Sequence, residues 1–380
     1  MNLQSLKYLI VGAGFYGSVL AERIAADLGE KVLVIDLRKH IGGNSYSEID
    51  PETGIEVHKY GSHIFHTANQ KVWDYVNRFT KFNNYRHRVL TRYQGQTYAM
   101  PINLMTINRF FNVDLNPAQA ADFIQKKIQA ENIPNPKNLE EKAISLIGRE
   151  LYEAFIKGYT QKQWETPLTQ LPENIITRLP VRMNFSDFYF ADPYEGLPID
   201  GYTKIFERIL AHPNITVQLD TDFFAIRDQI PKDCKIIYSG PIDRYFDFKY
   251  GVLGWRTTDF EVERPAVDDF QGTSVMNYAD LDVPYTRIHE FKHFHPERTF
   301  AKDKTVIFKE FSRVAKEHDV PYYPINTAQD KEKLAKYKEA AAQEKNVIFG
   351  GRLGNYVYID MHQAIAMALN TFDQIKNKSI

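Results

Sequence analysis

The sequence predicts an α/β protein built on a discontinuous, Rossmann-like dinucleotide-binding domain. Three observations carry this prediction: a glycine pattern between a strand and a helix, a second strand that ends in an acid, and a late strand followed by an apolar helix. The first two lie within residues 8–36 and the third within residues 346–372. We therefore expect both ends of the chain to meet in one nucleotide-binding domain, with other domains between them.

The first element is an apolar strand over Tyr8–Val11 that runs into a glycine turn and then a helix. Gly12, Gly14 and Gly17 form the G-x-G-x-x-G pattern, which permits the tight turn and brings backbone N–H groups to a pyrophosphate. The N-terminus of the helix adds N–H groups and a positive dipole end for the phosphates. A glycine-rich turn without a ligand is the alternative, but the order strand, turn, helix, strand and acid favours nucleotide binding.

The second strand, KVLVID, ends at Asp36, where the ribose of a dinucleotide needs a hydrogen-bond acceptor. The chain then continues through RKHIGGN into a second glycine turn at Gly42 and Gly43. This extension resembles the FAD-binding proteins of the glutathione-reductase type, in which the loop lies along the extended dinucleotide. The spacing therefore favours FAD over NAD. Because no other glycine fingerprint follows a strand, we expect no NAD(P)H domain and an external reductant for the flavin.

Composition restricts the partners and the compartment. The 380 residues carry 47 Lys and Arg against 48 Asp and Glu, and a near-neutral chain argues against nucleic acid or an anionic membrane as the main partner. Cys234 is the single cysteine, which excludes a disulfide framework and a cysteine metal site. We find no signal segment and no apolar run long enough to span a bilayer, so a cytoplasmic protein without membrane insertion is expected.

The rest of the chain is expected to divide into a mainly helical segment and a strand-rich segment. Helical spacing over NPAQAADFIQKKIQA, with Asn116 as N-cap and Pro117 at the first helical position, is followed by helical spacing up to Trp164. ITVQLDTDFFAI and KIIYSGPI are the clearest later strands, and DKEKLAKYKEAAAQEK indicates a solvated surface helix. The expected domains are residues 1–69 (first part of the FAD-binding domain), 70–182 (mainly helical, with a mobile loop near 165–182), 183–325 (strand-rich, with returns to the FAD-binding domain near 201–245) and 326–380 (C-terminal part of the FAD-binding domain).

Loops that combine aromatic residues with arginine predict a second, anionic ligand. Tyr159 and Trp164 precede Arg178 and Arg182 across a proline-broken segment. A tryptophan ring can stack on a nucleobase, and an arginine fork matches diphosphate oxygens. Further loops add Arg256, Tyr285, Arg287, Arg352, Tyr356, Tyr358 and Asp360. Each arginine alone fits a surface or ion-paired residue, but together they favour a nucleotide-like substrate.

Three histidines, His58, His63 and His66, lie in the segment HKYGSHIFHT. No Glu or Cys stands at metal-ligand spacing beside them, so we expect no metal site. A histidine packed beside the flavin ring is the favoured interpretation.

Six motifs resemble those of the bacterial UDP-galactopyranose mutases over essentially the whole chain: GAGFYG, HIGGN, YGSHIFHT, GYTQKQW, YTRIHEFKH and GRLGNYVYIDMHQAI. The resemblance implies a FAD-binding domain, a helical domain for substrate binding and dimerisation, and a six-stranded antiparallel sheet domain. It also implies a homodimer that interconverts UDP-galactopyranose and UDP-galactofuranose by ring contraction and supplies galactofuranose for surface polysaccharide. In this family FAD is active when reduced, and its N5 acts as a covalent nucleophile at the anomeric carbon while UDP leaves.

The family's functional residues are carried over motif by motif. Arg178 and Arg287 are expected to bind the diphosphate and to stabilise departing UDP, and His63 is expected to lie against the isoalloxazine. Expected substrate contacts are Asn84, Tyr159, Trp164 (stacked on uracil), Tyr189, Arg256, Asn277, Tyr323 and Tyr358. Expected cofactor contacts are Gly12, Gly14, Phe15, Gly17, Asp36, Leu37, Gly43, Asn44, His63, Ile64, Phe223, Arg352, Tyr358, Asp360, Met361 and Ile365. Ser62 and Ile156 depart from the family, which often has proline and phenylalanine at these positions.

Two other functions stay open on the sequence. A flavin amine oxidase or desaturase shares the glycine loops but needs a largely apolar substrate tunnel, which the arginine and tryptophan loops disfavour. A non-catalytic binder of FAD or a nucleotide sugar is compatible with the binding motifs alone. Acceptance of UDP-N-acetylgalactosamine as a further substrate depends on one or two side chains beside the sugar.

Overall fold

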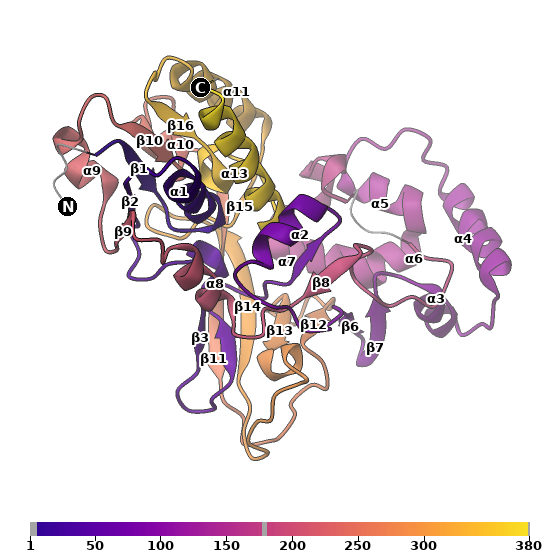
Figure 1. The fold of residues 1–380 in the computed structure, drawn as a ribbon. Coiled ribbons are helices and arrows are strands. Elements are labelled where there is room, and N and C mark those ends of the chain that lie inside the picture. Colours follow the sequence, from indigo (N-terminus) through magenta and orange to yellow (C-terminus); the bar gives the residue numbers. More distant parts are fainter. Residues whose placement is uncertain (1–5, 177–180, 379–380) are drawn as a thin grey trace.

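The structure, a computed structural model, describes residues 6–176 and 181–378. In this part of the chain the first domain contains a five-stranded parallel sheet in the order β16-β10-β1-β2-β9 (Figure 1). The central strands are apolar and buried, as expected for a parallel sheet covered on both faces. The strands are β1 (Tyr8–Val11), β2 (Val32–Ile35), β9 (Ile215–Gln218), β10 (Lys235–Tyr238) and β16 (Val347–Phe349).

Helices from the two ends of the chain pack together in this domain. α1 (Phe15–Asp27) packs against α13 (Met361–Lys376), and Tyr16 Oη lies 3.2 Å from Thr371 Oγ1. Their buried faces share one core with α2 (Gln70–Val76) and α8 (Tyr202–Ile209). The predicted discontinuous Rossmann-like domain is confirmed, because its strands come from three separate stretches of the chain.

The second domain is a sheet that, among the described residues, has seven strands in the order β15-β11-β14-β13-β12-β6-β7. Neighbouring strands are antiparallel except β12 and β6, which run parallel. The six-stranded, purely antiparallel sheet that the family resemblance implies is therefore corrected. The strands are β6 (Val89–Tyr93), β7 (Gln96–Met100), β11 (Trp255–Glu263), β12 (Val275–Tyr278), β13 (Arg287–Glu290), β14 (Ile307–Val314) and β15 (Tyr323–Pro324).

Within the segment 70–182, which the sequence predicts to be mainly helical, residues 89–100 form the two strands β6 and β7. Gln94 and Gly95 both have positive φ, 48° and 75°, and Tyr93 pairs with Gln96 across this turn. Two consecutive residues with positive φ form the two-residue turn of a β-hairpin. The hairpin attaches this part of the chain to the sheet instead of to the helices.

The third part is helical and lies to one side of the sheet (Figure 1). Its helices are α3 (Leu104–Phe111), α4 (Pro117–Glu131), α5 (Leu139–Ile147), α6 (Arg149–Leu151) and α7 (Gly158–Trp164), with a π-helical stretch over Tyr152–Lys157 before α7. Asn116 caps α4 as predicted, in a capping box with Gln119. Gly158 lets α7 approach the sheet, because a Cβ there would lie 2.0 Å from the carbonyl oxygen of Ala279.

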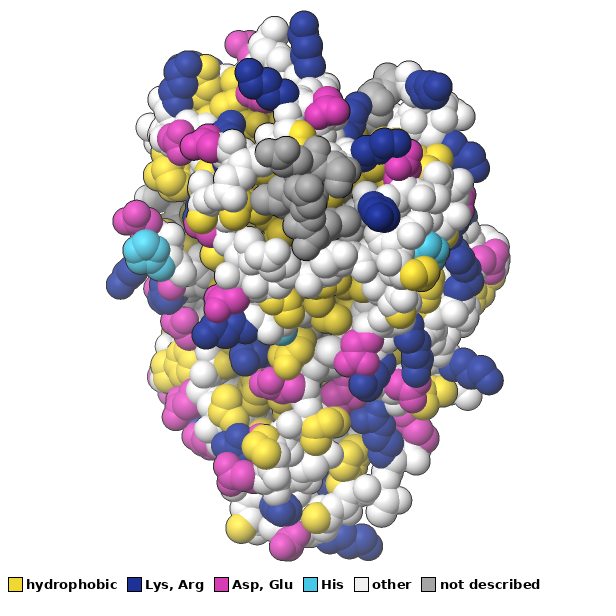
Figure 2. Space-filling view, turned by 60° about the vertical axis from the view of Figure 1, so that its left-hand side comes forward, with side chains coloured by type: hydrophobic (Ala, Val, Ile, Leu, Met, Phe, Trp, Pro, Cys, Tyr) yellow, Lys and Arg dark blue, Asp and Glu magenta, His cyan; other side chains and the backbone are white. Residues whose placement is uncertain are grey.

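Short elements connect these parts: β3 (Ser47–Ile49), β4 (Glu56–His58), β5 (Phe65–Thr67), β8 (Tyr194–Gly196), α9 (Phe223–Ile226), α10 (Ile242–Tyr245), α11 (Ala328–Ala341) and α12 (Gly351–Gly354). The predicted surface helix is α11, whose charged residues are mostly exposed. Within residues 6–176 and 181–378, no helix has the length and apolar character needed to cross a bilayer. Figure 2 shows acidic and basic side chains interspersed over one face of the molecule.

Candidate active site

Two glycine turns meet at the N-terminus of α1 and form the candidate dinucleotide cradle. Gly12 has φ +108°, and a Cβ on Gly17 would lie 2.0 Å from the Gly12 carbonyl oxygen, so the helix packs directly on the turn. The second turn abuts the first, since a Cβ on Gly43 would lie 3.2 Å from Gly14 Cα. Gly14 precedes α1 without a side-chain cap, which leaves the first N–H groups of the helix for an anion.

Asp36 ties the first glycine turn to the end of β2, and the Gly42 N–H joins the second turn to the first by donating to the Ala13 carbonyl oxygen at 2.8 Å. Asp36 Oδ2 accepts a hydrogen bond from Ala13 N at 2.8 Å, and its Oδ1 accepts one from Arg38 N at 2.9 Å. The Arg38 guanidinium donates to Asn44 Oδ1 at 2.7 Å and lies over the Tyr60 ring, 4.6 Å from its centroid. Arg38 Nη1 is buried and has no hydrogen-bond partner among the described residues. An unpaired guanidinium nitrogen beside the cradle fits an anionic ligand.

A cavity of about 1070 Å³ lies where the three parts of the structure meet. Single-ligand pockets are typically 300–1,000 Å³, so this cavity has room for one end of a dinucleotide together with a second ligand. The predicted site residues that line it are His63, Ile64, Tyr159, Trp164, Tyr189, Asn277, Arg287, Tyr323, Arg352, Tyr358, Asp360 and Met361. These residues come from positions as distant as 63 and 361, so the fold brings together predicted residues that lie far apart in the sequence.

Arg287 is held at the wall of this cavity by an anionic partner. Its Nε lies 3.1 Å from Glu310 Oε1, and its Nη2 donates to Tyr159 Oη at 2.5 Å. Burial alone would raise the pKa of Glu310, but the Arg287 charge and a hydrogen bond from His289 hold that pKa at about 2. Arg287 is therefore a charged, oriented donor in a buried setting, which suits a diphosphate.

The other walls combine aromatic rings with a few polar atoms. Tyr323 and Tyr358 stack with ring centroids 5.5 Å apart, and burial raises the pKa of Tyr323 to about 12, so its hydroxyl stays protonated. Asn277 Oδ1 is buried in β12 and has no hydrogen-bond partner within the described part of the chain. Burial lowers the pKa of His63 to about 4, and its Nδ1 lies 2.7 Å from the Gly61 carbonyl oxygen. His63 is therefore neutral, with Nδ1–H as the donor.

A lysine that the sequence analysis missed fixes α7, the helix that carries Tyr159 and Trp164. The Lys162 ammonium donates to four carbonyl oxygens of the segment between β12 and β13, at 2.8–3.0 Å: those of Tyr278, Asp280, Val283 and Tyr285. Burial lowers the pKa of Lys162 to about 8, while Asp280 and Asp282 act in the opposite direction. These four contacts of Lys162, which we call the Lys162 clamp, set the distance between Trp164 and the sheet.

The structure places some predicted residues elsewhere. Arg256 does not line the cavity: its side chain is 1% exposed and binds the Trp164 carbonyl oxygen at 3.2 Å and Glu165 at 3.1 Å. It thus binds the C-terminus of α7, and its predicted contact with the substrate stays a prediction. Asn84 is exposed and also lies outside the lining, because side chains alternate along this extended stretch and Tyr85 and His87 turn inward.

Several predicted cofactor residues also lie away from the large cavity. Phe223 packs its side chain against Tyr238 and Tyr245 below the sheet, and Phe15 and Ile365 are core residues. Leu37 is exposed at the turn after Asp36. Any contact of these residues with a cofactor would be made by backbone atoms or beside the glycine turns at the N-terminus of α1. Arg178 lies outside the described residues.

Among the residues that the structure describes, two groups of side chains could hold a metal ion: His66, Asp360 and His362, and Asp269, Glu290 and His293. In the first group His66 Nδ1 already lies 2.6 Å from Asp192 Oδ2, and the His66 ring stacks on Phe190. In the second group Glu290 already accepts hydrogen bonds from two backbone N–H groups and Thr305. The absence of a metal stays a prediction.

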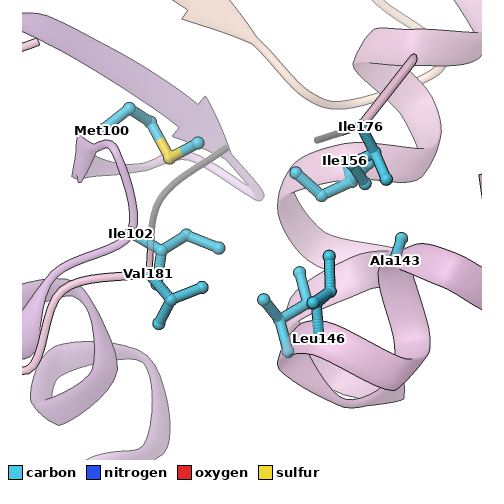
Figure 3. A pocket seen from close by; sticks show the side chains of 8 residues that line it. Met100, Ile102, Ala143, Leu146, Ile156, Ile176 and Val181 are labelled. Carbon is cyan, nitrogen blue, oxygen red and sulfur yellow. The ribbon is translucent and has the colours of Figure 1, made fainter. Parts of the chain in front are cut away.

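A small apolar cavity, whose lining Figure 3 shows, shares part of its wall with the large one. Met100, Ile102, Ala143, Leu146, Ile147, Ile156, Ile176 and Val181 line it, and Met100, Ile156 and Ile176 also line the large cavity. Its volume of about 10 Å³ matches a single water molecule, so it holds no ligand. Ile156, one of the two departures from the family pattern, thus forms part of the partition between the two cavities.

Fold and site together define a dinucleotide-binding α/β protein with a second cleft that is lined by arginine and aromatic side chains. A family model described as UDP-galactopyranose mutase matches residues 154–358, and one described as NAD(P)-binding Rossmann-like domain matches residues 10–79. The chain belongs to the UDP-galactopyranose mutase family. This membership and the Rossmann-like domain imply a mutase that uses a flavin-type cofactor.

Individual relatives agree with this assignment. A protein of Klebsiella pneumoniae named "Probable UDP-galactopyranose mutase" is 46% identical over 366 residues, which cover 96% of this chain and 94% of the relative. A dTDP-fucopyranose mutase of Escherichia coli is 41% identical, with 96% of both chains covered. The crystal structure of a reduced UDP-galactopyranose mutase superposes with a TM-score of 0.75 at 14% identity, covering 98% of this chain and 94% of the other, which shows a common fold.

Proposed function

We propose that this protein is a UDP-galactopyranose mutase that interconverts UDP-galactopyranose and UDP-galactofuranose with reduced FAD. The observation that carries the proposal is that His63, Trp164 and Arg287 all line the same large cavity. A nucleotide base needs an aromatic ring to stack on, and a diphosphate needs a fixed cation. A sugar that reacts beside a flavin needs a surface that shields it from water. The cavity offers all three.

FAD is the proposed form of the flavin. The glycine cradle at the N-terminus of α1, the buried Arg38 Nη1 and the Asp36 carboxylate beside the first turn fit the diphosphate and ribose of a dinucleotide. The chemistry that reduced FAD supplies when bound is a nucleophilic N5 for the anomeric carbon of the sugar. Asp36, Asn44, Asp360 and Met361 are proposed to hold it, and His63 is proposed to pack against it.

The side chains of this chain have three tasks in the proposed reaction. Arg287 binds the diphosphate and stabilises the charge that develops as UDP departs, and Arg178 is proposed to do the same from the opposite side. Trp164 stacks on uracil, while Tyr159 orients Arg287 through the hydrogen bond that its hydroxyl accepts. Asn277, Tyr189, Tyr323 and Tyr358 surround the sugar and limit the access of water to it.

The test is product analysis with UDP-galactopyranose, with and without dithionite. Formation of UDP-galactofuranose only after reduction supports the proposal. Consumption of an amine or alkyl substrate with oxygen instead would support the amine oxidase or desaturase alternative, and FAD binding without turnover would support a non-catalytic binder. Because a relative at 41% identity is named for dTDP-fucopyranose, dTDP-fucopyranose belongs in the same assay, as does UDP-N-acetylgalactosamine.

We further propose a cytoplasmic homodimer that takes electrons from an external reductant and supplies galactofuranose for surface polysaccharide. Size-exclusion chromatography with light scattering tests the dimer, whose expected mass is twice the chain mass of 44.2 kDa. A monomer at all concentrations would refute that part of the proposal and leave the reaction untouched.

A further inference from the structure

Two hydrogen bonds and an ion pair connect the loop of His63 to Arg287 through the sheet. Ser62 Oγ lies 2.5 Å from His289 Nδ1, and His289 Nε2 lies 2.8 Å from Glu310 Oε2. The other oxygen of Glu310 lies 3.1 Å from Arg287 Nε. His289 is fully buried in β13 and Glu310 is 7% exposed in β14, so water does not compete freely for these bonds.

The direction of each hydrogen bond follows from the chemistry. Glu310 is ionised and can only accept, so the proton of the His289 ring must lie on Nε2. Burial lowers the pKa of His289 despite the neighbouring carboxylate, so the ring is neutral and its Nδ1 is an acceptor. The Ser62 hydroxyl is therefore the donor to Nδ1. The Glu310 carboxylate thus selects the tautomer, and the Ser62 hydroxyl holds the other side of the ring that supports Glu310.

Ser62 is also joined to the other side of the cavity. It lies between Gly61, whose carbonyl oxygen is 2.7 Å from His63 Nδ1, and His63 itself, whose N–H donates to His58 Nδ1 at 3.0 Å. A Cβ on Gly61 would lie 3.7 Å from Glu310 Oε2, so this backbone packs directly beside the carboxylate. Displacement of Ser62 would therefore disturb both the histidine and the support of the arginine.

We propose that Ser62 and His289 are positioning residues for the reaction: through Glu310 they hold Arg287 in the orientation that binds the diphosphate, and they couple that orientation to the loop of His63. This inference rests on the proposed function. Proline cannot donate this hydrogen bond, so the serine at position 62 forms a contact that the residue often found there in the family cannot make. The relay joins the two walls that face the flavin and the diphosphate.

The experiment compares Ser62→Ala and Ser62→Thr in the FAD-loaded enzyme. Dissociation constants are measured for UDP and for uridine, which lacks the diphosphate, and kcat and KM are measured with dithionite-reduced enzyme. Ser62→Ala is expected to weaken UDP binding about three- to tenfold, the effect of one lost buried hydrogen bond, and to leave uridine binding unchanged. Ser62→Thr keeps the hydroxyl and is expected to restore UDP binding.

Ser145→Ala is the matched control, because Ser145 is half-buried and bonds only to the Lys142 carbonyl oxygen within its own helix. Equal weakening of UDP and uridine in Ser62→Ala would mean a general structural role and overturn the inference, as would unchanged UDP binding. A wild-type enzyme that binds neither UDP nor uridine would overturn the proposed function instead. Nitrogen NMR of the His289 ring adds a measurement that needs no ligand. A proton on Nδ1 at neutral pH would refute the proposed role of Ser62 and His289, whatever the binding results.

Discussion

Replacing Lys162 with methionine is the sharpest test of how α7 is held. The change keeps the apolar stem of the side chain and removes the ammonium that binds four carbonyl oxygens. Three N–H groups serve these four acceptors, so about three full hydrogen bonds to a charged donor are lost. Such bonds contribute about 1.5–3 kcal/mol each, and the lower value applies because Lys162 is only partly buried.

Relief of the desolvation of the ammonium offsets part of this loss, and we expect Lys162→Met to lower the free energy of unfolding by about 2–3 kcal/mol. Because α7 carries Tyr159 and Trp164, the affinity for UDP should fall as well. Urea unfolding at a fixed FAD concentration measures the stability, and titration with UDP measures the affinity. Lys126→Met, on the exposed face of α4, is the control and should change stability by less than about 0.5 kcal/mol. A loss below about 1 kcal/mol together with unchanged UDP affinity would refute the clamp.

Four further predictions follow from the site. The purified protein should be yellow and release FAD on denaturation; a colourless protein that takes up NAD but not FAD would contradict the cradle. Trp164→Ala should weaken UDP binding by about 1–3 kcal/mol, as expected for lost base stacking, and an unchanged affinity in a folded variant would return Trp164 to a packing role. Arg287→Lys and Arg178→Lys should each lose most turnover in chemically reduced enzyme and keep a normal FAD content. Lysine keeps the charge but lacks the paired N–H donors of the guanidinium. Near-normal turnover in both variants would place the diphosphate elsewhere. The free energy of unfolding should fall as the pH drops from about 6.5 towards 4, because burial holds the pKa of His63 at about 4 while the same histidine in the unfolded chain protonates at about 6.5. The fall should be smaller in His63→Gln. Urea midpoints at pH 7 and pH 5 measure it.

The sequence predicted the elements whose signals are local. Gly12, Gly14 and Gly17, the acid at Asp36 and the capping box at Asn116 each depend on residues within about one turn or strand of one another, and the structure has all of them in place. Family motifs located a part of the cavity lining, including His63, Trp164 and Arg287. These features follow from short-range chemistry that is visible in the order of residues.

The remaining features depend on contacts that no local pattern reveals. Arg256 resembles a ligand-binding arginine in sequence, but pairing in β11 directs it to the carbonyl end of α7. Lys162 meets carbonyl groups more than a hundred residues later, and Ser62 meets His289 across 227 positions. Only the register of the sheet decides which buried polar groups find one another. The hairpin at Gln94–Gly95 is different, because its turn chemistry was present in the sequence.

The dependence of the Rossmann-like sheet on both ends of the chain has a consequence for biosynthesis. During translation β10 keeps an open edge, and the apolar face of α1 stays uncovered, until β16 and α13 leave the ribosome. By then the sheet domain and the helical part are already synthesised, and they can fold before the first domain is complete. Capture of the dinucleotide must therefore follow the synthesis of β16 and α13, and a nascent chain stalled before residue 347 would expose a strand edge capable of pairing with another chain.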